Sequence, residues 1–256
     1  MRKGGAVPGM SRPAARGRAE HLLLAYPGRD IAVTAITVVL TAVVFAAVAS
    51  QGVLAHIQHL DKAWLRLMVT NRSGPVTALA RFLNVLGLVY VTLPVRIAIA
   101  GYLALRRRWW HLAAFVVAIV MSEALIGTLK AIYDRARPPG SLVATSGASF
   151  PSGHSIAATV TVVAAVIALV PPGRRRAWWG AGAVVFSALM ALSRAYLAAH
   201  WLSDAIAGVL LGTSCALLAA LVVGALQRRR GRRQPGGPAP PAGQPASGTT
   251  EPVDRR

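Results

Sequence analysis

Acidic residues and cysteine are both scarce in this chain of 256 residues. Aspartate and glutamate together number 8, charged residues make up 14% of the sequence, and 55% of it is hydrophobic. Soluble domains usually contain about 25% charged residues, so this composition argues against one. The single cysteine, Cys215, lies within a long apolar run, which excludes a disulfide framework. The composition therefore predicts a helical membrane protein.

Long apolar runs are abundant, and a helix needs about 20 such residues to cross a bilayer. Six runs are candidates, near residues 31–54, 82–105, 110–130, 154–170, 177–197 and 202–226. The predicted fold class is all-α, a polytopic membrane protein with a six-helix transmembrane bundle over residues 29–226. Residues 1–28 and 227–256 are rich in Gly, Pro, Ala and Arg without apolar periodicity, and we expect disordered basic tails there.

The first apolar run has a second interpretation, because "AVAS" at 47–50 resembles the cleavage site of a signal peptide. The apolar run continues past this point to Leu54, and the basic segment before it is long. We therefore favour an uncleaved first helix. Cleavage would leave the orientation of the other five unchanged.

The net charge of +20 has two explanations, nucleic-acid binding or membrane topology, and the positions of the cations distinguish them. Nineteen of the 28 Lys and Arg residues fall in residues 1–29, 106–108, 174–176 and 228–256. With six membrane-spanning helices, these segments all lie on one side, which the positive-inside rule assigns to the cytoplasm. We predict a multi-pass protein of the cell membrane with both termini cytoplasmic and no nucleic-acid partner.

Two further features concern the membrane. "HIQHLDKAWLRLM" at 56–68 has apolar residues at helical spacing with charges between them, which predicts an amphipathic helix on the outer surface. Arg96 and Glu123 fall inside apolar runs, where a charge is costly unless it is paired. We expect these two residues to form an ion pair that braces the bundle.

Three polar motifs fall on the predicted non-cytoplasmic side. "KAIYDRARP" at 130–138 ends the third apolar run, "PSGH" at 151–154 opens the fourth, and "SRAYLAAHWLSD" at 193–204 joins the fifth to the sixth. Each motif alone has an ordinary explanation as the polar end of a membrane helix. Together they bring three cations, two histidines and one aspartate to one face, namely Lys130, Arg137, Arg194, His154, His200 and Asp204.

The PSGH motif suits an anion. The first turn of a helix has unpaired backbone N–H groups and the positive end of the helix dipole, and both attract a phosphate. Ser152 and Gly153 let the backbone and a hydroxyl approach such a group closely, and His154 adds a proton donor.

The other two motifs are interpreted from their spacing. Lys130 and Arg137 are seven residues apart, which places them on one helical face if the helix continues for two turns. His200 and Asp204 are four apart, so one helical turn would bring the carboxylate to the ring. There it would accept the ring N–H and leave the other nitrogen free as a nucleophile.

The three motifs resemble the signature of the type-2 phosphatidic acid phosphatases, also called lipid phosphate phosphatases, which share it with the vanadium haloperoxidases. The matching positions are Lys130, six residues, Arg137 and Pro138; the PSGH at 151–154; and Ser193, Arg194, five residues, His200, three residues, Asp204. The resemblance covers residues 60–226. It is specific for the superfamily and much less so for a substrate.

The resemblance implies a phosphatase that needs no metal or other cofactor and acts through a phosphohistidine. His200 would attack phosphorus, oriented by Asp204, while His154 would protonate the leaving alkoxide and then help to activate water. The groups that would hold the phosphate oxygens are Lys130, Arg137, Arg194, Ser152 and the backbone N–H of Gly153.

An amphiphile is the expected substrate, with its tail in the lipid bilayer. Phosphatidic acid, phosphatidylglycerol phosphate, a polyprenyl diphosphate and a polyprenyl-phosphosugar phosphate all fit, and a non-cytoplasmic site modestly favours the polyprenyl carriers. Two other functions compete with this one. A haloperoxidase-like enzyme is disfavoured because those proteins are soluble, and a lipid transporter or scaffold would place its polar groups nearer the bilayer midplane.

Overall fold

The computed structural model describes residues 23–24 and 27–232, and the regular secondary structure of this part is entirely helical. Its elements are α2 (Pro27–Ala49), α3 (Gln51–Thr70), α4 (Gly74–Leu86), α5 (Val89–Leu105), α6 (Trp109–Tyr133), α7 (Gly153–Leu169), α8 (Arg174–Tyr196) and α9 (Leu202–Arg232). The all-α prediction is therefore confirmed for these residues.

The predicted tails lie outside the described residues except at their inner ends. There the structure differs from the expectation of disorder. Leu23 and Leu24 are buried against apolar residues of α6, α7 and α9. At the other end, α9 continues to Arg232, past the predicted boundary at residue 226. The N-terminal inner end is thus packed against the bundle, and the C-terminal one is helical.

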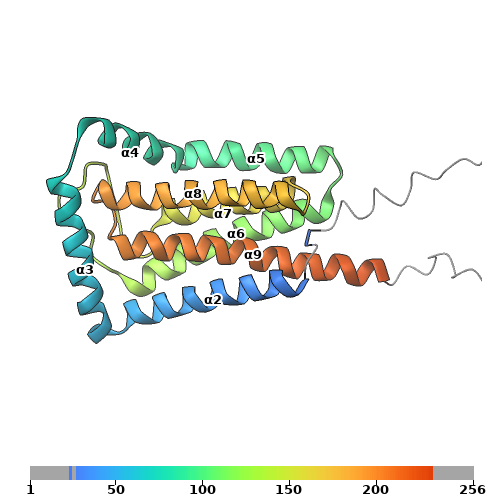
Figure 1. The fold of residues 1–256 in the computed structure, drawn as a ribbon, viewed down its shortest axis with the longest axis horizontal. Helices are drawn as coiled ribbons and strands as arrows, with labels where there is room; N and C mark the ends of the chain where they lie inside the picture. Colours follow the sequence, from blue (N-terminus) through green and yellow to red (C-terminus); the bar gives the residue numbers. More distant parts are fainter. Residues whose placement is uncertain (1–22, 25–26, 233–256) are drawn as a thin grey trace, which may run out of the picture.

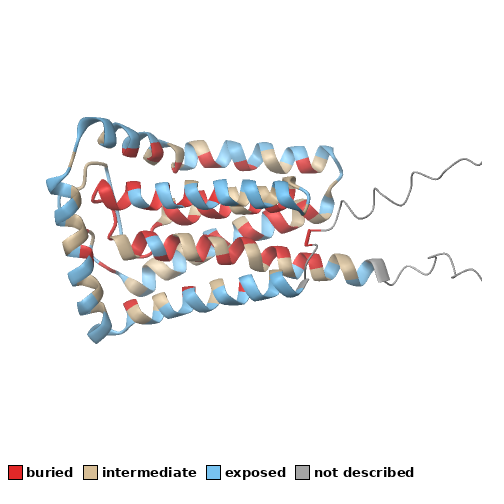
Figure 2. Ribbon diagram, viewed as in Figure 1, coloured by how far each residue is buried: buried red, intermediate tan, exposed pale blue. Residues whose placement is uncertain are grey.

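The bundle is built around α7. This helix packs against α6, α8 and α9, while α3 lies across one end of the other helices (Figure 1). The largest core cluster joins Ile156, Val160 and Ala164 of α7 to Leu211 and Cys215 of α9. Burial is concentrated on the inner helices, and α2, α4 and α5 expose much of their apolar surface (Figure 2). Such an exposed apolar surface is expected of helices that contact lipid.

α7 and α9 approach each other closely at two glycines. Gly208 and Gly212 are four residues apart on α9, the spacing of the small-residue motif of packed membrane helices. A Cβ atom would lie 2.8 Å from the carbonyl oxygen of Ser152 at the first position, and 2.8 Å from that of Ile156 at the second. Because these contacts involve backbone, the start of α7 reaches its place only if both positions lack a side chain.

Helix length and composition identify three helices that could span a membrane within the described residues, Gly28–Ala49, Trp109–Tyr133 and Leu202–Arg230. A fourth results if α4 and α5 count as one broken span. α7 is apolar but has only 17 residues. The count of six membrane-spanning helices stays a prediction.

Two of the predicted apolar helices are interrupted. The run near 31–54 ends as a helix at Ala49, where the chain turns into α3. The run near 82–105 is bent by 52° between α4 and α5. At this bend Gly87 faces the imidazole of His154, and a Cβ atom there would lie 2.5 Å from Cδ2 of the ring. A glycine is a poor helix former and admits the ring, so the break follows from both properties.

Candidate active site

The end of the bundle crossed by α3 brings the three sequence motifs together. α6 ends there, the loop 134–152 leads into α7, and a short turn at 197–201 joins α8 to α9. Backbone hydrogen bonds connect these segments: Ser152 N–H donates to the carbonyl oxygen of Asp204 at 3.1 Å, and Leu142 N–H to that of Leu197 at 2.9 Å. The motifs therefore form one continuous site.

His200 is held in the turn before α9 with its side chain only 3% exposed. The turn is tight: Ala198 has a φ of 53°, and the carbonyl oxygen of Arg194 accepts two N–H groups of the turn at 3.1 and 3.3 Å. Nδ1 of His200 lies 2.7 Å from the carbonyl oxygen of Ser149. A carbonyl only accepts, so Nδ1 carries the proton and the lone pair of the neutral ring is on Nε2. This Nε2 lies 3.3 Å from Nη1 of Arg137.

Burial keeps His200 neutral. Desolvation lowers its pKa to about 4, because the loss of water outweighs the attraction between the imidazolium and the carboxylate of Asp204. The positive charges of Arg194 and Arg137 lower the pKa in the same direction. At neutral pH the ring is therefore in the form whose Nε2 can act as a nucleophile.

Asp204 does not hold the His200 ring directly, contrary to the prediction from their spacing. That prediction assumed one shared helical turn, but α9 begins two residues after His200, and Oδ2 of Asp204 is 3.9 Å from Nδ1. The fully buried carboxylate accepts instead from Oγ of Ser149 at 2.5 Å, the N–H of Trp201 at 2.9 Å and Nη1 of Arg135 at 2.6 Å. Asp204 thus acts on the ring through Ser149, whose carbonyl receives the ring proton.

Lys130 and Arg137 do not share a helical face either. α6 ends at Tyr133, and Asp134 has a left-handed φ of 31°, so the helix does not continue for the two turns that the prediction required. Both cations still reach the same place, since Nζ of Lys130 and Nη2 of Arg137 each donate to the carbonyl oxygen of Ala148 at 3.2 Å. The loop 134–152, rather than a helix, brings them together.

Two buried nitrogen atoms of this cluster have no hydrogen-bond partner in the described part of the chain, Nε2 of His154 and Nε of Arg194. An unpaired buried polar group costs about 1–3 kcal/mol, so a ligand that pairs with it is favoured. His154 is the second residue of α7 and lies beside unpaired backbone N–H groups, and Nη1 of Arg194 is held by the side chain of Asn84. With the cations of the loop, these donors match an anion with several acceptor oxygens.

Four residues that hold the site together escaped the sequence analysis, namely Asp61, Asn84, Arg135 and Ser149. Arg135 and Ser149 lie inside or next to the quoted motifs, so a closer look at polar residues flanking those motifs could have found them. Asp61 and Asn84 are on α3 and α4, far from the motifs in sequence. No local signal marks them, because their partners are brought to them only by the packing of the bundle.

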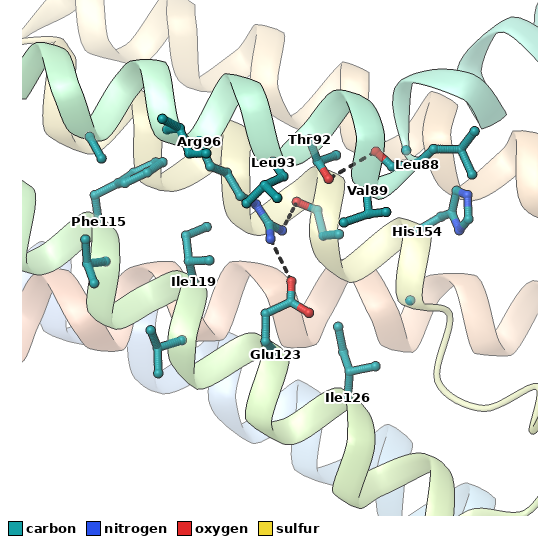
Figure 3. A pocket seen from close by; sticks show the side chains of 17 residues that line it. Leu88, Val89, Thr92, Leu93, Arg96, Phe115, Ile119, Glu123, Ile126 and His154 are labelled. Atoms are coloured by element: carbon teal, nitrogen blue, oxygen red, sulfur yellow. Dashed lines mark hydrogen bonds and ion pairs between the residues drawn. The ribbon is translucent and has the colours of Figure 1, made fainter.

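A largely apolar pocket of about 680 Å³ lies beside His154, between α5, α6 and α7 (Figure 3). Inside it, Nη1 of Arg96 and Oε1 of Glu123 form an ion pair at 2.7 Å, so the predicted pair is confirmed. Arg96 also donates to Thr161 Oγ1 at 2.9 Å and to the carbonyl oxygen of Ala157 at 3.3 Å. The pair therefore ties α5 to α6 and to α7, where the contacts of Arg96 lie one to two helical turns from His154. The apolar walls include Leu88, Leu93, Phe115, Ile119 and Ile126.

The fold and the site define a class of protein: a helical membrane protein whose bundle end gathers two histidines, a buried aspartate and three cations around a place suited to a phosphate. Residues 111–228 match the model of the PAP2 superfamily. All three motifs lie in this matching segment. The resemblance stated from the sequence is thus confirmed.

Two solved structures are similar to the chain. One is a transmembrane PAP2 type phosphatidylglycerolphosphate phosphatase from Bacillus subtilis, with a TM-score of 0.65 and 25% identity, over 78% of this chain and 98% of that one. The other is LpxE from Aquifex aeolicus, with a TM-score of 0.52 and 22% identity, over 62% of this chain and 94% of that one. The second similarity shows the fold alone. No curated protein matches the sequence significantly.

Proposed function

We propose that the protein is an integral membrane phosphatase that hydrolyses a phosphomonoester or diphosphate of a membrane lipid through a phosphohistidine. The observation that carries the proposal is the way His200 is held. Its Nδ1 is engaged by the carbonyl of Ser149, and its Nε2 lies 3.3 Å from a guanidinium nitrogen of Arg137. A neutral imidazole in this setting has its lone pair beside a cation that can bind the phosphate to be attacked.

The first chemical step forms a bond between Nε2 of His200 and phosphorus while the bond from phosphorus to the leaving oxygen breaks. His154 acts in its imidazolium form, which the negative charge of the bound phosphate favours, and gives its proton to that oxygen. The Nδ1–H of His200 stays hydrogen-bonded to the carbonyl of Ser149. In the second step water attacks phosphorus, neutral His154 takes the proton of the water, and the electron pair of the phosphorus–nitrogen bond returns to Nε2. The products are orthophosphate and the dephosphorylated lipid.

Three cations stabilise the transition state in this scheme. Charge builds up on the non-bridging oxygens as phosphorus becomes five-coordinate, and Lys130, Arg137 and Arg194 provide fixed positive charge there. Ser152 and the N–H of Gly153 at the start of α7 add donors for the same oxygens.

The pocket beside His154 suits the lipid tail. Its volume of about 680 Å³ and its apolar walls match a hydrocarbon chain that enters from the bilayer between α5 and α6. The candidate substrates are phosphatidic acid, phosphatidylglycerol phosphate and polyprenyl phosphates or diphosphates. The Bacillus subtilis structure, a phosphatidylglycerolphosphate phosphatase, supports a glycerophospholipid, whereas a non-cytoplasmic site supports a polyprenyl carrier.

The proposed function is tested by phosphate release from a panel of these lipids with purified protein in detergent micelles. Release from at least one lipid, and none from its already dephosphorylated form, is the expected result. If none of the lipids releases phosphate while the protein is folded, the proposal is wrong and a lipid-binding or transport function gains support.

Activity should persist in the presence of excess chelator. The groups assigned to transition-state charge are side-chain cations, and among the described residues no three His, Cys, Asp or Glu side chains are placed to hold a metal ion. We expect the rate of phosphate release in EDTA to stay within about twofold of the untreated rate, because cations of the chain supply the electrostatic term. A complete loss that magnesium restores would contradict this mechanism.

The site should face the non-cytoplasmic side of the membrane. We propose this from the cation distribution, and fusions of a topology reporter test it. A fusion at Gly140, in the exposed loop between α6 and α7, should report the non-cytoplasmic side. A matched fusion at Pro172, between α7 and α8, should report the cytoplasm. A cytoplasmic signal at Gly140 would overturn the orientation while leaving the chemistry of the site untouched.

A further inference from the structure

A chain of buried charges runs from the crossing helix α3 to the site. Nη2 of Arg135 donates to Oδ2 of Asp61 at 2.8 Å, and Nη1 of the same side chain donates to Oδ1 of Asp204 at 2.6 Å. The side chains of Arg135 and Asp61 are 7% and 3% exposed. One guanidinium therefore links a carboxylate of α3 to the carboxylate at the start of α9. Both carboxylates are buried away from solvent.

Both carboxylate oxygens of Asp61 accept hydrogen bonds from residues next to the site. Its Oδ1 accepts the backbone N–H of Ser203 at 2.9 Å, and its Oδ2 accepts the hydroxyl of Ser203 at 2.6 Å. Gln58, one turn earlier on α3, accepts a further bond from Nη2 of Arg135 at 2.8 Å. The first turn of α9 and the loop that carries Arg135 are thus both anchored to α3.

Arg135 positions Ser149 both through its backbone and through its side chain. The carbonyl oxygen of Arg135 accepts the N–H of Ser149 at 2.7 Å, and its guanidinium orients Asp204, which accepts the hydroxyl of Ser149 at 2.5 Å. Ser149 in turn presents its carbonyl to Nδ1 of His200 at 2.7 Å. The backbone and the side chain of one arginine therefore both fix the residue that decides which ring nitrogen carries the proton.

We propose that Asp61 and Arg135 are positioning residues for the nucleophile: through Asp204 and Ser149 they fix the tautomer and direction of the His200 ring. This inference rests on the proposed function. It makes α3 part of the catalytic apparatus in addition to any contact that this helix has with the membrane surface. Buried charges are expensive when one partner is lost, so the network tolerates little rearrangement.

If the Asp61–Arg135 network only stabilised the fold, the same variants would give a different result. Loss of a network that only stabilises the fold lowers the free energy of unfolding and the amount of active protein, and leaves kcat per folded molecule unchanged. A positioning network acts on the orientation of the nucleophile, so its loss lowers kcat and leaves substrate binding as it was. The two roles are therefore distinguished by measuring both the free energy of unfolding and kcat per folded molecule for each variant.

The first experiment compares Asp61→Asn with Asp134→Asn, both nearly isosteric and both removing one negative charge. Asp134 is exposed, adjoins Arg135 and has a left-handed φ that asparagine accepts, so its variant should keep wild-type kinetics. For Asp61→Asn we expect kcat to fall by about 10- to 100-fold, the range known for residues that orient a catalytic ligand, with KM within about twofold. A wild-type kcat in Asp61→Asn would overturn the proposal.

The second experiment tests the route through Asp204. Arg135→Lys retains a charge that can pair with only one carboxylate, so it should recover part of the kcat that Arg135→Gln loses. Combining Arg135→Gln with Asp204→Asn should cost little more than Asp204→Asn alone, because both act on the same ring. Fully multiplicative losses, in samples whose thermal unfolding is matched, would show that Arg135 acts elsewhere.

A third measurement needs no turnover, and so separates failure of this inference from failure of the proposed function. The ¹⁵N chemical shifts of His200, assigned by comparison with His200→Ala, report which ring nitrogen carries the proton. The wild type should show Nδ1–H, and Asp61→Asn should show a detectable share of the other tautomer. Unchanged shifts in Asp61→Asn would contradict the positioning role, even in a protein that hydrolyses none of the lipids tested.

Discussion

His200→Ala should lose all phosphate release and all phosphoenzyme. Removal of a covalent nucleophile eliminates the pathway, and losses on the order of 10⁶-fold in kcat are known for such changes. In the structure, Nδ1 of His200 donates to the carbonyl of Ser149 and Nε2 lies beside Arg137. Among the described histidines, only His200 is shown with this pair of contacts. Rapid-quench measurement with a ³²P-labelled lipid should trap an acid-labile, base-stable phosphoenzyme in the wild type and none in the variant.

His59→Ala is the matched control for this experiment. His59 is an exposed histidine on α3, outside the charge network that links this helix to the site. Its variant should keep wild-type turnover and the same amount of phosphoenzyme. Wild-type phosphate release from folded His200→Ala would show that the nucleophile is wrongly assigned, and a trapped phosphoenzyme in that variant would place the covalent bond on another residue.

His154→Ala should fail in a way that depends on the leaving group. A general acid contributes about 10²- to 10⁴-fold, and the contribution is largest when the leaving oxygen is a poor leaving group. We therefore expect a loss in this range with a lipid alkyl phosphate and a much smaller one with p-nitrophenyl phosphate. The Brønsted slope over a series of aryl and alkyl phosphates measures the difference. An equal loss for every leaving group would contradict the role of acid.

The same variant should also accumulate phosphoenzyme when the leaving group is good. His154 activates water in the second step of the proposed scheme, so its loss slows hydrolysis of the phosphohistidine while p-nitrophenol still leaves rapidly. A larger burst of p-nitrophenol in His154→Ala than in the wild type, followed by slower turnover, is the expected result. This outcome separates His154 from His200, whose removal should abolish the burst.

Much of the fold and of the candidate site could be predicted from the sequence. Apolar runs and a shortage of charge predict membrane helices, because a bilayer admits only chain segments that satisfy their own backbone. Motif residues with fixed spacing predict the family, and the beginning of the fourth apolar run correctly places Ser152 and Gly153 at the start of α7. The Arg96 and Glu123 pair could be predicted for the same kind of reason, since two charges in hydrocarbon need each other.

Predictions from spacing were wrong where the helix stops. Lys130 and Arg137 share a face only if α6 continues, yet it ends at Tyr133 and a loop brings the two cations together. His200 and Asp204 are four apart, but the first lies in a turn and the second in α9. Oδ2 therefore stays 3.9 Å from Nδ1, and the ring N–H donates to the carbonyl of Ser149 instead. Helical periodicity holds inside a helix and says nothing about a loop beyond its end.

The sequence by itself determined the membrane class, the superfamily and the identity of the residues that meet the phosphate in the proposed mechanism, because these depend on composition and on residue type at fixed spacing. Only the tertiary structure decided which other residues hold these site residues in place. Asp61 reaches Arg135 from a helix 74 residues away in sequence, and Gly87 makes room for His154 by a bend between two helices. Such partners depend on how whole helices pack, and burial of a charge is possible only where packing supplies its counterpart.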